Sequence, residues 1–399
     1  MTRYLLAPFP LHGHVVPMVA LAEELAERGH RVDVVISPEF AGVFREVGCT
    51  VTEIAIRPRG GVPEKATVGH KVRRLRRMYD VFREQRRLTG ELVARWGELD
   101  PVVVVADIMA IWGIRAAEAA GVPFVSFFVT YAVSEEVLLD EVRQQLGPRA
   151  AAVVRALGIA RVQPGLRRSV TRGAALALVN TVPELQPARE SFDARYQFVG
   201  PLRQEVADTA AHDGDDLPWD RIEREKALYV STGTMFTRGA EFFRKVADAF
   251  AGTDWLVIMA TSHTDPAELG TLPDNVIARR YVPQSAVLER CQAFLSHAGM
   301  NSALEGLALG LPMVLVPRAS DQKEIARRLE AAGAGIVVPA ESEGGSFLAA
   351  VERVVADQEV RATLDRLSER MDRRGGPAAA AELLEKLAAD RPHRRGAAS

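Results

Sequence analysis

The chain has 399 residues, of which 48% are hydrophobic and 26% are charged. This length exceeds one ordinary hydrophobic core, so two domains are the expected organisation. A formal net charge of -2 gives no sign of a nucleic-acid or acidic-membrane partner for the chain as a whole. The two cysteines, Cys49 and Cys291, lie far apart in the sequence and argue against a disulfide scaffold.

The first residues have the pattern of a strand and not of a signal peptide. The segment YLLAPFP is preceded by two polar residues and lacks a basic n-region and a cleavage site. No apolar run reaches the ~18 residues that a membrane-spanning helix needs. We therefore expect a cytoplasmic protein without a transmembrane segment.

Strand and helix patterns alternate along the first half of the chain. Tyr4–Pro8 is typical of a buried strand, and Val16–Arg28 of an amphipathic helix with Pro17 in its first turn. Arg31–Ser37 is the next predicted strand. The strand–helix–strand rhythm favours a parallel sheet, and it continues through Pro101–Ala106, Ala116–Ala120 and Phe124–Phe128.

A second series of the same kind begins after a polar, acidic, turn-rich segment that we interpret as a linker. The sequence therefore predicts an α/β protein of two Rossmann-like domains, with parallel sheets facing an interdomain cleft. The predicted boundaries are 1–205 for the first domain, 206–225 for the linker, 226–376 for the second domain and 377–390 for a C-terminal helix. The predicted strands of the second domain are Ala227–Ser231, Trp255–Ala260, Val276–Ala278, Ala293–Ser296, Met313–Val316 and Ile336–Val338.

The junction from Ser296 to Glu305 joins a predicted strand to a predicted helix. Gly299 lets the backbone turn closely, and Asn301 and Ser302 are suited to cap the new helix. The free amides and positive dipole end of such a helix attract phosphate. A second interpretation stays open, since Ser302-x-x-Glu305 also matches a capping box that needs no ligand.

Polar residues follow other strands of the second half as well. Gly233 and Thr234 end the strand of LYVSTGT, and Asp321 and Gln322 follow the strand of MVLVP. Ligands of open α/β sheets collect beyond the carboxyl ends of strands. Together with His297 and Glu305, these residues suit the phosphates and hydroxyls of a sugar nucleotide. Neither half carries the GxGxxG fingerprint, which weakens a nicotinamide or flavin interpretation.

The first strand is followed by His12-Gly13-His14-Val15-Val16-Pro17. A histidine at this place is suited to take the proton of an attacking hydroxyl near neutral pH. Asp107, which ends the strand of VVVVAD, is positioned to orient such a base. The residues themselves do not separate His12 from His14, and both His14 and Asp107 could instead cap the helices that follow them.

Four motifs then carry a resemblance to a known family. HAGMNSALEG, PRASDQ, RYVPQ and VSTGT occur in the order and spacing of the nucleotide-sugar-dependent family 1 glycosyltransferases. Within that family the chain is most similar to the bacterial members that modify macrolides and other natural products. The resemblance implies a GT-B fold whose C-terminal helix crosses back to the N-terminal domain.

The resemblance also implies a role for particular residues. His14 would be the general base and Asp107 its partner, and Tyr281 would stack on the nucleotide base where the family usually has tryptophan. The resemblance favours a UDP-sugar, while tyrosine in place of tryptophan weakens the expected preference for uracil and leaves a dTDP-sugar open. The remaining donor contacts would be Thr234, His297, Gly299, Asn301 and Ser302 for the diphosphate, Glu305 for the ribose, Val282 and Gln284 for the base, and Asp321 and Gln322 for the sugar.

The acceptor is the least defined ligand. In the family its pocket involves the regions of Lys71–Arg87 and Phe127–Leu146, where Phe127, Tyr131 and Leu138 could form an apolar wall or belong to the core. The arginine-rich segment Lys71–Arg87 is either a solvated helix face or a contact for an anionic acceptor, membrane or partner.

We thus expect an inverting glycosyltransferase that needs no metal or other cofactor and acts on a small hydroxylated acceptor. The Asp213-Gly214-Asp215 pattern lies in the acidic linker, where a solvated turn is the better interpretation. A homodimer is possible. An epimerase or hydrolase of the same fold, and a non-catalytic sugar-nucleotide-binding protein, are the alternatives.

Overall fold

The computed structural model describes residues 1–56, 83–133, 139, 143, 147–149, 151–152, 173–203, 217–233, 238–318, 320–373 and 375–390. The chain forms two compact units, and it passes from one to the other more than once. The first unit comprises Met1–Asn180, Gln186–Gln204 and Gly375–Ser399, and the second comprises Thr181–Leu185 and Glu205–Arg374. None of the helices in the described ranges is both long and apolar enough to span a bilayer.

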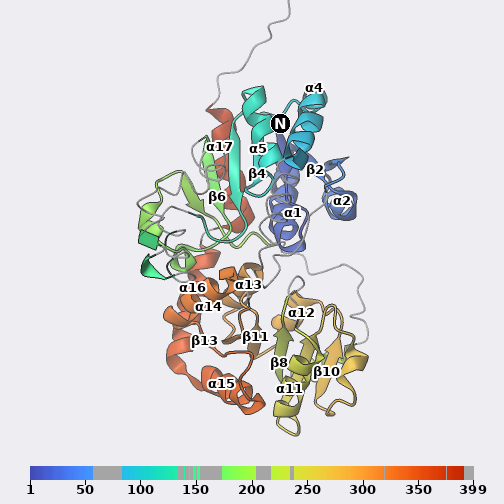
Figure 1. The fold of residues 1–399 in the computed structure, drawn as a ribbon, viewed down its shortest axis with the longest axis vertical. Coiled ribbons are helices and arrows are strands. Elements are labelled where there is room, and N and C mark those ends of the chain that lie inside the picture. Colours follow the sequence, from blue (N-terminus) through green and yellow to red (C-terminus); the bar gives the residue numbers. More distant parts are fainter. Residues whose placement is uncertain are drawn as a thin grey trace, which may run out of the picture. The chain divides into compact units, whose positions relative to one another are not determined.

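The first unit is built on a seven-stranded sheet in which every pairing is parallel. The strand order is β3-β2-β1-β4-β5-β6-β7, and β2, β4 and β6 of this sheet are labelled in Figure 1. All five residues of the valine-rich β4 are buried, as expected for a parallel strand covered on both faces. The strands are β1 (Arg3–Ala7), β2 (Arg31–Ile36), β3 (Thr50–Glu53), β4 (Val103–Asp107), β5 (Phe124–Phe128), β6 (Leu176–Val179) and β7 (Tyr196–Phe198).

Helix α1 (His12–Glu27) begins four residues earlier than the sequence predicts, directly after the turn that follows β1. Pro17 therefore lies inside the helix and not at its first turn. A proline this close to the start costs only one intrahelical hydrogen bond, so the helix tolerates it. Further helical segments of this unit include η1 (Pro38–Phe40), α2 (Ala41–Glu46), α4 (Trp96–Leu99), α5 (Ile111–Ala120) and η3 (Arg189–Ser191), and residues 83–94 are helical as well.

Helix α17 (Gly376–Ala389) also belongs to the first unit, although it follows the second unit in the chain. It packs against α1, and Figure 1 shows the two helices side by side in red and blue. Ala380, Ala381 and Leu384 are buried in the same hydrophobic cluster as residues of β1, β2 and α1. Glu385 fixes the contact by accepting from Arg28 (3.2 Å) and bonding His30 (2.8 Å).

The second unit repeats the design with a six-stranded parallel sheet in the order β10-β9-β8-β11-β12-β13. The strands are β8 (Lys226–Ser231), β9 (Trp255–Ala260), β10 (Val276–Arg279), β11 (Ala293–Ser296), β12 (Met313–Leu315) and β13 (Gly335–Val337). The helices are α10 (Trp219–Arg224), α11 (Ala240–Phe250), α12 (Gln284–Leu288), α13 (Met300–Ala308), α14 (Ser320–Ala331), α15 (Gly344–Ala356) and α16 (Gln358–Asp372), with the short η2 (Pro183–Leu185) and η5 (Pro266–Leu269).

Two features of the second unit differ from the predicted boundaries. Helix α10 lies within the predicted linker 206–225, so that segment is partly ordered structure. The short segment Thr181–Leu185 joins the second unit, where η2 contacts α14 and Glu184 accepts from Arg370 (2.7 Å). The strand patterns failed to indicate either feature because both are short and carry little periodicity.

Candidate active site

Both sheets reverse their strand order at one point, and the candidate residues gather there. The reversal lies between β1 and β4 in the first unit and between β8 and β11 in the second. Ala7 is paired with Ala106, and Ser231 with Ser296, so the neighbouring strands end at the same level. The turns that leave these strands therefore start side by side, at the switch point where doubly wound sheets bind ligands.

In the first unit this arrangement brings His14 to Asp107. The His14 Nδ1 and Asp107 Oδ2 atoms are 2.7 Å apart. The Asp107 side chain is fully buried and that of His14 is 22% exposed. The second carboxylate oxygen of Asp107 accepts from the backbone N–H of Met109 (2.7 Å), which fixes the orientation of the carboxylate. Because the carboxylate accepts, Nδ1 carries the proton, and Nε2 keeps its lone pair for another hydrogen.

The same geometry answers the alternatives that the sequence left open. His14, and not His12, contacts Asp107; His12 is exposed at the first residue of α1. Neither His14 nor Asp107 caps a helix, since the N-cap of α1 is Leu11 and that of α5 is Ala110. The capping interpretations of these two residues are therefore wrong.

In the second unit, His297 follows β11 and its ring lies between two glycines. A Cβ atom on Gly233 would meet the Nε2 atom of His297 at 2.5 Å, and one on Gly299 would meet it at 2.4 Å. Gly233 also has a φ of +77°, and Ala298 adopts the left-handed region with a φ of +61°. Backbone strain of this kind is concentrated at functional sites. The turn is thus shaped around the imidazole.

Three buried polar atoms at adjacent strand ends have no hydrogen-bond partner in the described part of the chain. They are Thr232 Oγ1 after β8, Ser262 Oγ after β9 and His297 Nδ1 after β11. A buried polar atom without a partner is costly, so groups of them indicate that something outside the chain satisfies them. Their position matches the edge where a nucleotide is expected. Thr232 stands within the VSTGT motif, whereas no sequence pattern singled out Ser262.

The charge near this turn comes from Arg238 and not from His297. Burial lowers the pKa of His297 to about 4, with the positive charge of Arg238 acting in the same direction and the carbonyl of Ser231 opposing both. His297 is therefore neutral at physiological pH and serves as a hydrogen-bonding group.

Arg238 is a half-buried cation that sequence analysis missed. Its Nη2 atom donates to the carbonyls of Val316 (3.0 Å) and Pro317 (3.3 Å), and its guanidinium lies 5.1 Å from the centre of the Phe242 ring. Among the described residues no carboxylate lies within ion-pair distance of it. Its hydrogen bonds connect it to the strand ends, because the N–H of Val316 donates to the carbonyl of Ser296 (2.8 Å). It thus places a positive charge beside the His297 turn.

Helix α13 begins at Met300 with Gly299 as its N-cap, and no side chain caps it. Asn301 and Ser302 lie inside the first turn, so the expectation that they cap the helix, and the capping-box alternative for Ser302 and Glu305, are wrong. The reason is that the close turn at Gly299 starts the helix earlier than a serine cap would. The helix thus starts without a side-chain cap, at the kind of helix N-terminus that attracts phosphate.

Glu305 is held from a neighbouring helix. Gln284 Nε2 donates to its Oε2 atom (2.5 Å) and Ser285 Oγ donates to its Oε1 atom (2.5 Å). Gln284 also contacts Ser302 Oγ at 3.4 Å. The structure thus places Gln284 beside the carboxylate expected to bind ribose, and it adds Ser285, which no motif indicated.

The remaining donor residues lie at two loops. Tyr281 is 46% exposed between β10 and α12, and Val282 beside it is half-buried. Asp321 is exposed in the first turn of α14, whereas Gln322 is buried and its side-chain oxygen accepts from the N–H of Arg318 (2.9 Å). Gln322 therefore also organises the loop that presents Asp321.

The proposed acceptor wall is not borne out at Phe127. That ring is fully buried in the core cluster of the first unit, because β5 is covered on both faces. Tyr131 is buried just beyond β5. Thr234, Leu138, the Asp213-Gly214-Asp215 pattern and most of Lys71–Arg87 lie outside the described residues.

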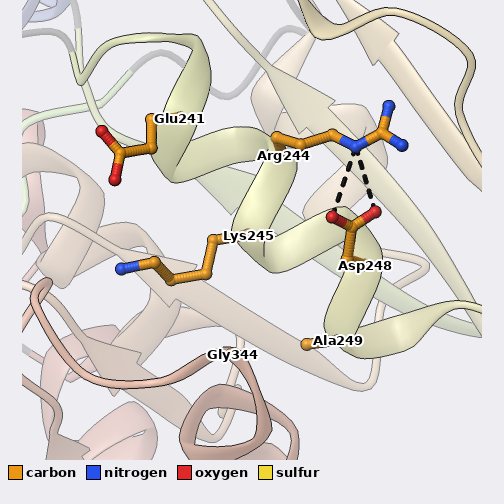
Figure 2. A pocket seen from close by; sticks show the side chains of 6 residues that line it. All are labelled: Glu241, Arg244, Lys245, Asp248, Ala249 and Gly344. Atoms are coloured by element: carbon orange, nitrogen blue, oxygen red, sulfur yellow. Dashed lines mark hydrogen bonds and ion pairs between the residues drawn. The ribbon is translucent and has the colours of Figure 1, made fainter.

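A hollow of about 510 Å³ in the second unit lies on α11 (Figure 2). Arg244 and Asp248 form an ion pair in its lining (3.0 Å), which Glu241, Lys245, Ala249 and Gly344 complete. None of the candidate site residues lines it. Over the described ranges, no group of three or more His, Cys, Asp or Glu side chains could hold a metal ion.

Comparison with known proteins agrees with this arrangement. Residues 12–139 match the glycosyltransferase family 28 N-terminal domain, and residues 244–387 match the erythromycin biosynthesis protein CIII-like C-terminal domain. The NDP-glycosyltransferase YjiC of Bacillus subtilis (strain 168) is 29% identical, with 94% of this chain and 95% of that protein aligned. The demethyllactenocin mycarosyltransferase of Streptomyces fradiae is 30% identical, covering 95% and 85% respectively.

The crystal structure of CalG4, the calicheamicin glycosyltransferase, is similar with a TM-score of 0.79 and 32% identity, covering 98% of this chain and 99% of that one. The two parallel-sheet units therefore have the GT-B glycosyltransferase fold. The chain belongs to the family 1 nucleotide-sugar-dependent glycosyltransferases of the natural-product type. It is a transferase of the macrolide type that uses a nucleotide-diphosphate sugar.

Proposed function

We propose that this enzyme transfers a sugar, with inversion at the anomeric carbon, to a hydroxyl group of a small hydrophobic natural product. The observation that carries the proposal is the 2.7 Å contact between His14 Nδ1 and the buried carboxylate of Asp107. That contact leaves Nε2 of His14 as the basic atom, and Asp107 stabilises the imidazolium that forms when it takes a proton.

The chemical step follows from these roles. His14 Nε2 removes the proton of the acceptor hydroxyl as its oxygen forms a bond to the anomeric carbon. The bond between that carbon and the diphosphate oxygen breaks, and the electron pair leaves with the nucleoside diphosphate. Attack and departure on opposite faces of the sugar give inversion. His14 returns its proton to solvent after product release.

The departing diphosphate gains negative charge, and the turn of the second unit offers three ways to stabilise it. The positive dipole end of α13 attracts the anion, neutral His297 adds a hydrogen bond, and Arg238 supplies a full positive charge. With these groups the enzyme needs no metal. Thr234, Asn301 and Ser302 complete the proposed diphosphate contacts.

The proposed donor is a UDP- or dTDP-sugar. Tyr281 stacks on the base with Val282 and Gln284 beside it, Glu305 binds the ribose, and Asp321 with Gln322 binds the sugar. The similar proteins are named for demethyllactenocin, oleandomycin and calicheamicin, which supports a natural-product acceptor.

One assay tests the proposal. The enzyme is incubated with UDP-glucose or dTDP-glucose and a panel of macrolide and phenolic aglycones, and the anomeric configuration of each product is read by NMR. We expect a β-glycoside from the α-configured donor. Rapid donor consumption without acceptor would instead indicate an epimerase or hydrolase, and binding of donor without any turnover would indicate a non-catalytic protein.

A further inference from the structure

The carboxylate of Glu305 already has a protein donor on each oxygen. Gln284 Nε2 lies 2.5 Å from Oε2, and Ser285 Oγ lies 2.5 Å from Oε1. Both donors come from the first two residues of α12, and Glu305 lies on α13 of the same unit. Glu305 is half-buried, so its oxygens are not freely hydrated.

This arrangement changes what the carboxylate requires of a nucleoside. A site that binds a hydroxyl through an otherwise unpaired buried oxygen rejects an analogue without that hydroxyl, because the oxygen is left without a partner. Here neither oxygen of Glu305 depends on the ligand for its first hydrogen bond. Loss of one ribose hydroxyl therefore leaves no unsatisfied acceptor.

We infer that Ser285 is a specificity-determining residue that makes the nucleoside site accept 2′-deoxyribose and ribose about equally. The inference rests on the proposed function, because it takes Glu305 as the ribose contact. Thymidine diphosphate sugars and uridine diphosphate sugars would then both serve as donors. Any preference between them would come from contacts with the pyrimidine base and not from contacts with the ribose or deoxyribose.

Ser285 rather than Gln284 carries this effect. The side-chain amide of Gln284 has two N–H groups. It contacts Ser302 Oγ at 3.4 Å as well as Glu305, so replacing it would disturb both of these residues of α13. The hydroxyl of Ser285 has a single proton, which it gives to Glu305. Removing that hydroxyl leaves Oε1 without this donor, and a 2′-hydroxyl is then able to replace it.

The test compares UDP with dUDP, which differ only in the 2′-hydroxyl, by isothermal titration calorimetry on the full chain. In the wild-type protein we expect dissociation constants within about threefold of each other. In Ser285→Ala we expect dUDP to weaken about fivefold or more relative to UDP, because the hydrogen bond that Oε1 of Glu305 loses with the Ser285 hydroxyl can be replaced by the 2′-hydroxyl of UDP but not by dUDP. Ser285→Thr, which keeps the hydroxyl, should restore the wild-type ratio.

Ser346→Ala serves as the matched control, since Ser346 is an exposed serine of α15 in the same unit. Thermal unfolding of each variant checks that it is folded. The inference is overturned if wild-type protein binds UDP at least tenfold more tightly than dUDP, or if Ser285→Ala weakens both ligands equally. Failure of wild-type protein to bind either nucleotide would overturn the proposed function itself, and this inference with it.

Discussion

Each unit places a histidine at the switch point of its sheet, after β1 in the first unit and after β11 in the second, and the two histidines have opposite surroundings. His14 follows the first strand of its sheet at the switch point, is 22% exposed and has a buried carboxylate on Nδ1. His297 also lies at a switch point, but its Nδ1 atom is buried without a partner in the described residues and the charge that acts on its ring is the cation of Arg238. One neighbour is an anion and the other a cation.

This difference separates a base from a hydrogen-bonding group. A carboxylate stabilises the protonated ring that a base must form, whereas burial beside a cation keeps the ring neutral. The shared fold places each histidine at a strand end, and the charged groups that surround the ring determine whether it acts as a base or as a hydrogen-bonding group. The following predictions test that contrast, beginning with the largest effect.

Replacing His14 should have the largest effect on turnover and little effect on the donor. In His14→Ala we expect kcat to fall about 100-fold or more because the general base is lost. UDP affinity, measured by calorimetry, should stay unchanged because His14 lies in the other unit. His12→Ala is the control and should keep most of its activity; near-normal turnover of His14→Ala would remove His14 from the mechanism.

Filling the space around His297 should instead weaken the binding of the donor nucleotide. A Cβ on Gly299 would meet His297 Nε2 at 2.4 Å, so Gly299→Ala must displace the ring from the turn. We expect UDP affinity to fall by about tenfold, the range that overpacking of a site gives. Gly345→Ala is the control, because nothing lies within 4 Å of the Cβ that it would add. Equal UDP affinity in both variants would show that the ring does not shape the donor site.

Arg238→Met tests whether the second unit supplies charge to the leaving group. We expect kcat/KM to fall about tenfold with a larger loss in kcat than in UDP affinity, since the charge develops in the transition state. Arg244→Met is a matched control: Arg244 also donates to two carbonyls, those of Leu269 and Thr271, but lies at the hollow of Figure 2. A similar loss in both variants would indicate a purely structural role for Arg238.

The lowered pKa of His297 predicts a dependence of stability on pH. Between the ordinary pKa of about 6.5 and the folded-state pKa of about 4, His297 binds a proton in the unfolded chain but not in the folded chain. Folded-state stability should therefore fall as pH decreases through this window. Thermal unfolding between pH 7.5 and 4.5 should show a smaller decrease for His297→Gln than for the wild type. Parallel curves would contradict the assigned environment.

The smallest expected effect is that of a chelator. Because the helix amides and Arg238 are proposed to stabilise the diphosphate, excess EDTA should leave the initial rate unchanged. A loss of activity that Mg²⁺ or Mn²⁺ restores would show that these groups are insufficient.

Much of the fold could be predicted from the sequence because parallel strands are short apolar runs between amphipathic helices. Phe124–Phe128, Trp255–Ala260 and Ala293–Ser296 are strands over the predicted residues. Three strands escaped prediction: β3 (TVTE) is polar, β7 (YQF) has three residues, and β6 (LALV) is apolar but has only four. The first two lack the pattern of a buried strand, and an apolar run as short as β6 cannot be told from part of a buried helix by its periodicity.

The candidate site could be predicted only where one local turn contains it. The sequence indicated the His297 turn, but it could not choose between His12 and His14, since that choice depends on Asp107 more than 90 residues away. Arg238, Ser262 and Ser285 escaped notice for the same reason. The role of each depends on a residue from a distant part of the chain, such as the carbonyl of Val316 for Arg238 or the carboxylate of Glu305 for Ser285.

The return of α17 to the first unit has a consequence for synthesis on the ribosome. Ala380, Ala381 and Leu384 belong to the cluster that also buries Met18 and Leu25 of α1. The N-terminal unit therefore lacks part of its core until the whole second unit has emerged from the exit tunnel. Although domains commonly fold in the order of their synthesis, here the helix that carries His14 in its first turn is completed by a helix that follows the second unit in the chain.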